Sequence, residues 1–548
     1  MSANPPFEVL VVGAGPVGLT MACELARSGV RCRIIDKVAA PASTSRALAI
    51  FPRTLEVFEM MGVIDPVLKA GHQLNGVAIY NRSGQIAHIG FSSLPSRYRF
   101  AISLPQSQTE RLLIEHLAHF GIVVDREKEL VTLSQSTDTV QTVIRDSEGL
   151  EEKLESDWLI GCDGAHSSVR RLLSLPFEGD DYPETFLLAD VKIDGLRDHI
   201  HVHLFLTGEG LVGIFPFRGD RCRIIVNTQK EEEGQSAGDP RLDEIQAIAG
   251  SRTNTGLRLT DPVWLSRFRI SHRKIKDFRV GRVFLAGDSA HVHSPAGGQG
   301  MNTGIQDAFN LAWKLALIVH QKAPDSLLNS YNEEREPVAK MVLSLTDRLT
   351  RIATLQGALG QQLRNALLPI LTGIHIVEDR IAETMAEIGI HYRRSSIVSG
   401  KTGHAVHAGD RAPDCEFQLD PGGNALRLFD LFRKPVHHLL FFADADADLA
   451  SKANAFRVEM GRDFKGLIDA FVVVRGTHAD FSNVLFDWDG GAHVLYEAEP
   501  GAIFLIRPDG YIGFRGGARH SEALQEHLAR IFSNGSNRIY TSNNPGYL

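Results

Sequence analysis

Residues 9–18 read Val9-Leu10-Val11-Val12-Gly13-Ala14-Gly15-Pro16-Val17-Gly18, an apolar run that leads directly into a Gly-x-Gly-x-x-Gly turn. A helix predicted over 19–28 and a strand over 31–36 complete a βαβ unit. Gly13 allows the tight turn, Gly15 lets the backbone approach a pyrophosphate, and Gly18 lets the helix pack closely on the strand. The free N–H groups of the helix N-terminus would face the diphosphate.

An acidic residue follows this turn at the distance that a dinucleotide site needs. Asp36 ends the second strand, 21 residues beyond Gly15, where its carboxylate can accept hydrogen bonds from the ribose of an adenosine. A glycine-rich turn alone is weak evidence. Placed after a strand, before a helix and with this acid, it predicts a dinucleotide site.

Two later glycine-bearing segments indicate that the dinucleotide is FAD. One is Gly161-Cys162-Asp163-Gly164, and the other is the strand that ends in Gly287-Asp288. Helix capping alone would explain Asp288. It does not explain the following Pro295-Ala296-Gly297-Gly298-Gln299-Gly300-Met301-Asn302, which opens a long helix whose dipole could face a flavin.

These three segments resemble those of the class A flavoprotein monooxygenases, the single-component FAD aromatic hydroxylases. The resemblance spans nearly the whole chain and is to the branch of phenol and pentachlorophenol hydroxylases and aromatic polyketide hydroxylases. It implies that Asp288 binds the ribityl chain and that Asp163 serves FAD and the nicotinamide cofactor. It further implies that Arg46 touches FAD phosphate or the nicotinamide nucleotide and that Gln106 contacts the flavin. The isoalloxazine would be lined by Pro295, Gly297, Gly298, Gly300, Met301 and Asn302.

The resemblance also implies the reaction. NADH or NADPH would reduce FAD, the reduced flavin would react with O2 to a C4a-hydroperoxide, and a phenolic or polycyclic aromatic substrate would be hydroxylated. The site must exclude water, because the oxygenated flavin otherwise releases peroxide. Two alternatives stay open at this point: Baeyer–Villiger-type oxygenation of an aromatic polyketide, and a non-catalytic flavin-binding protein.

The residue that would activate the phenol is not evident. Phenol hydroxylase carries an aspartate five residues before the arginine that corresponds to Arg53, and Leu48 stands there instead. His201 and His203 share one face of a predicted strand, and Arg223 could bind an anionic substrate. Edge-strand histidines that face water are the simpler interpretation, so no catalytic residue is assigned.

The predicted fold class is α/β: a Rossmann-like FAD-binding domain, an inserted β-sheet substrate domain and a C-terminal thioredoxin-like α/β domain. The thioredoxin-like domain carries no CxxC pair, which favours a scaffolding or dimer-contact role. Cutting the chain near residue 400 should therefore change its association before its flavin chemistry. The predicted limits are 1–185 and 278–395 for the FAD domain (interrupted by 74–103), 74–103 and 186–277 for the β domain, 405–535 for the thioredoxin-like domain, and 536–548 for a flexible tail.

Composition restricts the partners. The net charge of -8 provides no basic stripe, so nucleic acid is not expected. The five cysteines are odd in number and lack CxxC spacing, which favours a cytoplasmic location and no metal site. The apolar stretch 311–319 contains Lys314 and is too short to span a membrane. We expect a small aromatic substrate and O2 as partners, and a possible homodimer.

Overall fold

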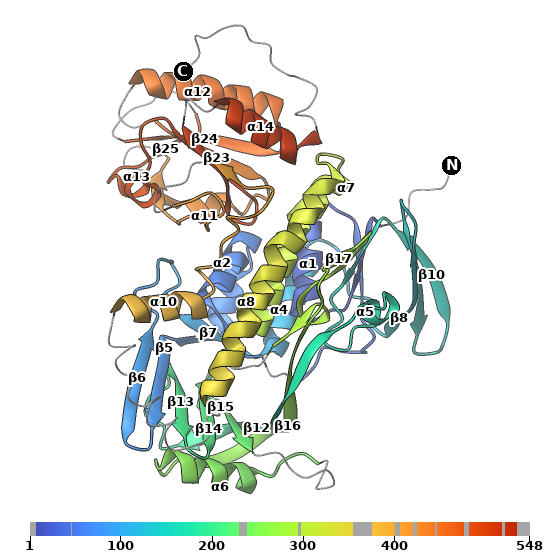
Figure 1. Cartoon of the computed structure of the whole chain (residues 1–548), viewed down its shortest axis with the longest axis vertical. Coiled ribbons are helices and arrows are strands. Elements are labelled where there is room, and N and C mark those ends of the chain that lie inside the picture. Colours follow the sequence, from blue (N-terminus) through green and yellow to red (C-terminus); the bar gives the residue numbers. More distant parts are fainter. Residues whose placement is uncertain are drawn as a thin grey trace.

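The computed structural model shows three regions arranged along the long axis of the molecule (Figure 1). It describes residues 7–44, 47–228, 238–293, 297–353, 375–400, 406–419, 425–443, 447–475, 482–517 and 521–533. Arg46, Pro295 and the predicted tail 536–548 lie outside these ranges. Among the helices that the structure describes, none combines the length and hydrophobicity needed to cross a bilayer.

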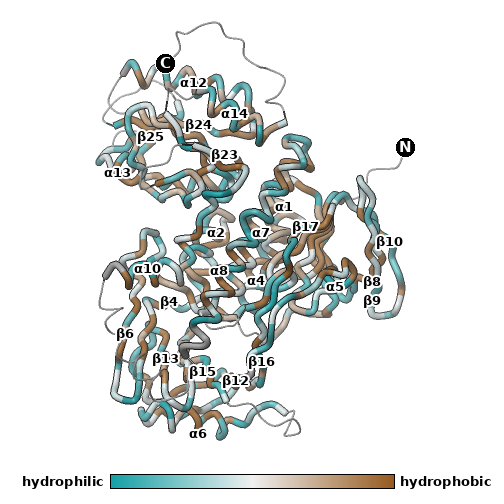
Figure 2. Tube along the Cα trace, in the orientation of Figure 1, coloured by the Kyte–Doolittle hydropathy of each residue, from teal (hydrophilic) through white to brown (hydrophobic). Residues whose placement is uncertain are grey.

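The central region is built on a five-stranded sheet in the order β17-β18-β11-β1-β2, in which only β17 runs antiparallel. Its four parallel strands are almost wholly buried, as expected for a sheet that is covered on both faces. Figure 2 shows these hydrophobic strands gathered beside the helices. The elements are β1 (Val9–Val12), β2 (Cys32–Ile35), β11 (Trp158–Gly161), β17 (Arg279–Val280) and β18 (Val283–Leu285), with α1 (Pro16–Arg27) and α7 (Gly300–Val319) packed against each other.

The second region is an eight-stranded sheet in the order β19-β16-β12-β15-β14-β13-β5-β6. Its β5–β6 hairpin comes from residues well before the other strands, as the alternating pattern of 74–103 predicts. Helix α6 (Leu242–Thr253) packs on one face of this sheet. The strands are β5 (Gly76–Asn81), β6 (Gly84–Gly90), β12 (Glu178–Asp194), β13 (His201–Thr207), β14 (Gly210–Pro216), β15 (Arg221–Thr228), β16 (Arg258–Lys274) and β19 (His291–Val292).

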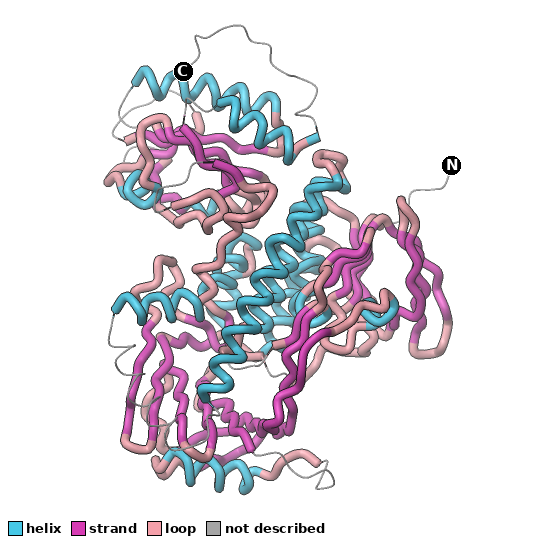
Figure 3. The backbone as a smooth tube through the Cα atoms, viewed as in Figure 1, coloured by secondary structure: helices cyan, strands magenta, loops and turns pink. Residues whose placement is uncertain are grey.

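Two small sheets and further helices complete the part of the chain before the C-terminal region. Figure 3 shows the long helices crossing the middle of the molecule. The strands are β3 (Ala49–Ile50), β4 (His72–Leu74) and β7 (Ala101–Ser103) in one sheet, and β8 (Lys128–Gln135), β9 (Val140–Asp146) and β10 (Glu151–Ser156) in the other. The helices are α2 (Pro52–Met61), α3 (Ile64–Ala70), α4 (Gln106–Ala118), α5 (Ser168–Leu172), η1 (Gly287–Ser289), η2 (Asp325–Leu328), α8 (Asn329–Ala353) and α10 (His375–Met385).

The C-terminal region has its own eight-stranded sheet, in the order β20-β27-β26-β23-β24-β25-β21-β22. The central strand β23 pairs parallel with β24 and antiparallel with β26, a mixed sheet that agrees with the predicted thioredoxin-like α/β domain. Its strands are β20 (Ser399–Gly400), β21 (Glu416–Gln418), β22 (Ala425–Arg427), β23 (His437–Phe442), β24 (Ile468–Val474), β25 (Val484–Phe486), β26 (Ala502–Ile506) and β27 (Ile512–Gly517). Its helices are α11 (Leu428–Leu431), α12 (Ala447–Asp463), α13 (Gly491–Tyr496) and α14 (Ser521–Ile531).

Buried ion pairs join the C-terminal region to the central helices. Arg507, in the turn after β26, pairs with Glu334 of α8 at 2.6 Å, and both side chains are fully buried. Arg411 pairs with Glu56 of α2 at 3.1 Å. The segment 390–413 looks like a linker in sequence, but its Arg411 is only 9% exposed. The C-terminal region is therefore packed firmly against the rest of the chain.

Candidate functional site

The first glycine turn shows which of its glycines the protein itself requires. Gly13 has φ +103°, and an added Cβ would lie 2.4 Å from the carbonyl oxygen of Cys162. A Cβ on Gly18 would lie 1.9 Å from the carbonyl oxygen of Gly13. A Cβ on Gly15 would meet nothing within 4 Å, and no side chain caps the N-terminus of α1. The space in front of this helix is therefore open to a phosphate group.

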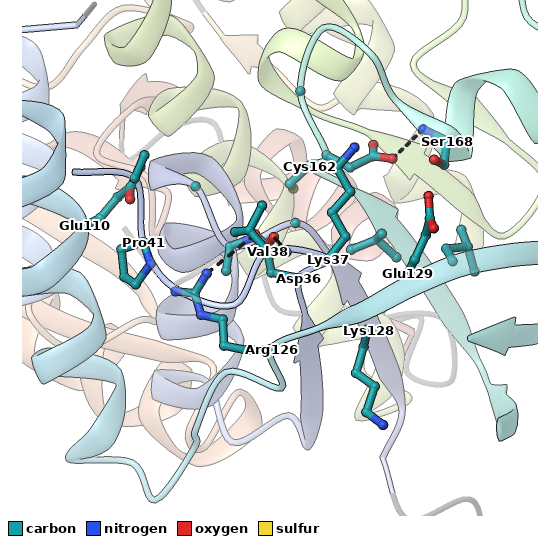
Figure 4. A pocket seen from close by; sticks show the side chains of 18 residues that line it. Asp36, Lys37, Val38, Pro41, Glu110, Arg126, Lys128, Glu129, Cys162 and Ser168 are labelled. Atoms are coloured by element: carbon teal, nitrogen blue, oxygen red, sulfur yellow. Dashed lines mark hydrogen bonds and ion pairs between the residues drawn. The ribbon is translucent and has the colours of Figure 1, made fainter. Parts of the chain in front are cut away.

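Asp36 lies beside this turn at the end of β2 (Figure 4). Its carboxylate accepts hydrogen bonds from the backbone N–H groups of Ala14 at 2.6 Å and Val38 at 3.0 Å. Arg126 approaches the same carboxylate, with 3.8 Å between the charged atoms. These contacts fix Asp36 at the edge of a cavity of about 260 Å³, which the turn, Asp36, Arg126 and Asp163 all line.

Sequence reasoning missed Arg126. The backbone N–H of Asp36 donates to the carbonyl oxygen of Asp125, and that of Asp125 donates to the carbonyl oxygen of Ile34, at 2.9 Å each. This parallel bridge extends the sheet edge beyond β2 and places Arg126 at the cavity. The apolar run that ends at Asp125 could have indicated a strand end. Its pairing with β2, about ninety residues earlier, could not be read from the sequence.

Asp163 enters the same cavity from the second segment. One of its carboxylate oxygens accepts the backbone N–H groups of Ser168 at 2.6 Å and Val169 at 3.2 Å, at the start of α5. The other oxygen, Oδ1, is buried without a hydrogen-bond partner among the described residues. An unsatisfied buried acceptor is costly, so this atom marks a place where a ligand hydroxyl or N–H could donate.

Arg170 connects the second segment to the third. Its guanidinium donates to the carbonyl oxygen of Ser289 at 2.9 Å and to that of Ala165 at 2.6 Å. The hydroxyl of Ser289 in turn donates to the carbonyl oxygen of Gly161 at 2.6 Å. Two segments more than a hundred residues apart in sequence therefore form one structural unit.

The third segment presents Asp288 in η1, directly after β18. Its side chain is exposed and has no hydrogen-bond or ion-pair partner among the described residues. The N-cap of α7 is Gln299, so Asp288 does not cap that helix. Gly287 before it has φ +61°, and its N–H donates to Asp307 of α7 at 3.0 Å. This loop leaves the Asp288 carboxylate available to a ligand.

The glycine loop before α7 has the conformation that its composition predicts. Gly297 and Gly298 have φ +105° and +67°, a region that side chains disfavour. Met301 is buried, and a Cβ on Gly300 would lie 3.5 Å from the His293 ring. The Asn302 side chain is fully used by the protein: it accepts from the N–H of Phe51 at 2.9 Å and donates to the carbonyl oxygens of Ala49 and Gly298 at 2.9 and 3.0 Å. Only the backbone of Asn302 is left for a cofactor.

Gln106 begins α4 and donates from its side chain to Glu110 at 2.7 Å. Glu110 lines the cavity beside Asp36. Gln106 therefore contacts a residue that lines the cavity but does not line the cavity itself. Its expected contact with the flavin stays a prediction.

The three substrate-side candidates are already engaged with the protein. His203 is buried on β13, which lies between β5 and β14, so the interpretation as an edge-strand histidine that faces water is wrong. Its ring contacts the carbonyl oxygen of Asp198 at 2.8 Å, and the His201 ring contacts the Asp198 carboxylate, also at 2.8 Å. Arg223 forms two hydrogen bonds of 2.8 Å with Asp190, which neutralises its charge.

The sheet face opposite α6 carries the side chains that are suited to an aromatic ligand. Cross-strand pairing places Trp264, Asp190, Arg223 and Phe215 in one row on this face. Tyr182 on β12 reaches Asp347 of α8 with its hydroxyl at 3.1 Å, so the face is turned toward the central helices. Its half-buried apolar side chains are Trp264, Phe215, Ile225 and Leu204.

Known proteins with similar sequences or structures agree with this geometry. Residues 6–346 match the family model described as FAD binding domain, and 405–535 match that described as aromatic-ring hydroxylase, C-terminal. The chain is 36% identical over 537 residues to 6-methylpretetramide 4-monooxygenase from Streptomyces rimosus, covering 96% of this chain and 93% of the relative. It is 32% identical to pentachlorophenol 4-monooxygenase from Sphingobium chlorophenolicum, covering 94% and 95%. The solved structure of anhydrotetracycline hydroxylase from Streptomyces rimosus superimposes with a TM-score of 0.76 at 27% identity, covering 96% of this chain and 99% of that one.

Proposed function

The chain belongs to the class A FAD-dependent aromatic hydroxylases, and we propose that it hydroxylates a phenolic substrate with fused rings. It is an FAD-dependent monooxygenase that consumes NADH or NADPH and O2. The substrate proposal is supported by relatives named for 6-methylpretetramide and anhydrotetracycline, and by Trp264 and Phe215 at the two ends of the cross-strand row on the sheet face.

One observation carries the proposal: the first two glycine segments line one cavity, the third follows the neighbouring strand β18 of the same sheet, and the protein leaves acceptors on these segments free. The turn at Gly15 is open in front of a helix N-terminus, and Asp163 has an unsatisfied buried oxygen. Asp288 is exposed on the next strand of the same sheet. An FAD diphosphate at the helix N-terminus, its ribose near Asp36 and its ribityl chain near Asp288 would satisfy these groups.

The protein supplies binding, orientation and the exclusion of water. FAD, when bound, accepts hydride from the nicotinamide and activates O2. The free backbone N–H groups at the start of α7 would stabilise negative charge on the flavin ring through the helix dipole. The apolar sheet face would cover the substrate and limit access by water. Arg223 is neutralised by Asp190, so the substrate need not be an anion.

A cytoplasmic location and a homodimer stay predictions. So do the cofactor roles assigned to Arg46, Gln106 and Pro295, two of which lie outside the described residues.

A coupled oxidation assay tests the proposed function. FAD-saturated protein is mixed with NADPH or NADH and with anhydrotetracycline or pentachlorophenol, and nucleotide oxidation is followed under air. We expect an aromatic substrate to accelerate nucleotide oxidation and to gain one ring oxygen. In anhydrotetracycline this oxygen would be a new ring hydroxyl, identified by NMR, whereas pentachlorophenol would release chloride as the oxygen enters. A ring-expanded lactone would favour Baeyer–Villiger oxygenation instead. Nucleotide oxidation that no member of a broad panel of phenols and polycyclic quinones accelerates would favour a non-catalytic flavoprotein.

A further inference from the structure

Three buried side chains form a hydrogen-bonded chain next to the start of α7. Asp307 of α7 contacts Nε2 of His291 at 2.6 Å, and Nδ1 of His291 contacts Nε2 of His293 at 3.1 Å. Asp307 and His291 are fully buried, and His293 is 9% exposed. The two imidazole rings stack with their centroids 5.1 Å apart. We call this set the Asp307–His291–His293 relay.

The protonation of the relay follows from its partners. Burial would raise the pKa of Asp307, but the ion pair with Arg335 and the contact with His291 outweigh it and hold that pKa at about 2. The ionised carboxylate therefore accepts, and Nε2 of His291 carries a proton. In the neutral relay Nδ1 of His291 carries no proton and accepts a hydrogen bond from the Nε2–H group of His293. The remaining nitrogen of His293, Nδ1, is then a bare proton acceptor.

The acceptor end of the relay faces the proposed flavin site. Nδ1 of His293 lies 3.5 Å from the position of a Cβ on Gly300, the first residue of α7. The loop with Gly297 and Gly298 comes directly before that residue. His291 belongs to β19, an edge strand that pairs with Arg273 and Lys274 at the end of β16. The relay thus ends beside the start of the helix that is expected to face the flavin.

We propose that His293 is the general base that removes the phenolic proton of the substrate, directly or across one water, with His291 and Asp307 as positioning residues. This proposal rests on the proposed function. It supplies the base that is missing at Leu48, which is a buried aliphatic side chain. The arrangement is the one in which an acid orients a histidine and stabilises the cation that forms when the histidine accepts a proton.

The proton transfer is balanced within the relay. The phenolic O–H bond breaks, and Nδ1 of His293 gains that proton. Nε2–H of His293 passes to Nδ1 of His291. The substrate becomes a phenolate, His293 stays neutral, and His291 becomes a cation next to the ionised Asp307. Burial lowers the pKa of His293 to about 3, which agrees with the positive charge resting on His291 rather than on His293.

Other titratable groups lie around the relay among the described residues. They are Arg335 and Tyr331 of α8, Asp288 of η1, Cys162 after β11, Glu387 after α10, and Arg273 and Lys274 of β16, which pairs with β19. Burial raises the pKa of both Tyr331 and Cys162, so these two groups stay neutral near pH 7. Arg335 is held by Asp307 at 2.6 Å and keeps its charge. None of these groups replaces His293 as an acceptor at the start of α7.

A chromogenic phenol tests the relay without turnover. The probe is 4-nitrophenol, bound to the FAD-saturated full-length protein in the absence of NADPH, and the phenolate absorbance is titrated against pH. We expect wild type to lower the ionisation midpoint of the bound probe by about one pH unit or more relative to free probe. His293→Gln should abolish that shift. The control is His203→Gln, an equally buried histidine on β13 whose loss should leave the shift unchanged.

Turnover provides the second readout. With a phenol that is neutral at the assay pH, His293→Gln should slow single-turnover hydroxylation by about 100-fold or more. Pentachlorophenol, which is already ionised, should lose little rate. His291→Gln should show the same pattern, because the relay is interrupted. Equal rate loss with both phenols, or a wild-type midpoint shift that persists in His293→Gln, would overturn the proposal. A wild type that hydroxylates no member of a broad panel of phenols and fused-ring phenols would instead refute the proposed function.

Discussion

Glu387 is a buried carboxyl at the end of α10 whose partners are uncharged donors. Thr303 donates to it at 3.0 Å, and the Gln306 side chain contacts its second oxygen. Burial raises its pKa from 4.5 to about 8. The Gln306 carbonyl oxygen is buried without a partner among the described residues. An amide flip of Gln306 would let protonated Glu387 donate to that oxygen, since the two orientations are hard to distinguish.

Glu387 should therefore make stability depend on pH. A folded-state pKa above the unfolded one means that the contribution is complete below about pH 4.5 and is lost as pH rises through about 8. The free energy of unfolding of wild type should fall over this range with a slope of at most about 1.4 kcal/mol per pH unit from this group. Glu387→Gln should remove that part of the slope in urea titrations. An unchanged slope would show that Glu387 is ionised in the folded protein.

At the scale of single residues, the sequence predicted the positions of residues that belong to one continuous motif. Gly13, Gly18 and Asp36 lie within one motif, so their spacing was enough to place them. Arg126 and the relay were missed because their partners are brought together by strand pairing and by a loop. Asn302 was expected to line the flavin, but its side chain binds Phe51 and Ala49, which no local pattern indicates.

At the scale of elements, Asn302 ties α7 to the strand and helix that begin at Ala49. Asn302→Ala removes three hydrogen bonds and leaves the buried N–H of Phe51 without its acceptor. We expect a loss of about 2–4 kcal/mol in the free energy of unfolding, from the lost bonds and the stranded donor. Urea denaturation followed by circular dichroism measures it. A loss below about 0.5 kcal/mol would mean that water replaces the side chain without cost.

The elements themselves were predicted more fully than the site. The βαβ unit and the β5–β6 hairpin follow from apolar periodicity and turn residues. Periodicity could not show that β13 is internal to its sheet, because strand order depends on β5 inserting beside it from far away in sequence. The burial of His203 follows from that order.

At the scale of the whole molecule, the buried pairs change the expectation for truncation near residue 400. Removal of the C-terminal region would leave Glu334 without Arg507, in a cluster that also holds Lys314 at 2.7 Å. Glu334 would keep only Lys314 of its two buried cationic partners, and loss of a buried partner is strongly destabilising. Truncation should therefore unfold the central region and release FAD, rather than change association first. A soluble truncated chain that retains FAD and its melting temperature would contradict this.

A single substitution tests the same buried ion pairs without removing the C-terminal region. Arg507→Met should lower the free energy of unfolding by about 3–5 kcal/mol, because Asp509 loses its buried ion-pair partner and Glu334 keeps only Lys314. Arg145→Met is the control, since its pair with Glu151 is exposed and is worth about 1 kcal/mol or less. Equal effects in urea denaturation would show that the buried pairs do not hold the two regions together.

The central claim is that Gly15 leaves space for the diphosphate of FAD, whereas Gly13 is required by the protein itself. FAD titration of apo-protein, paired with melting of the same apo-protein, tests it most directly. Gly15→Val should keep the wild-type apo melting temperature and lose FAD affinity by at least about 100-fold, because its side chain occupies only the ligand space. Gly13→Ala should lower the melting temperature before any FAD is added. A Gly15→Val protein that binds FAD as tightly as wild type would contradict the account.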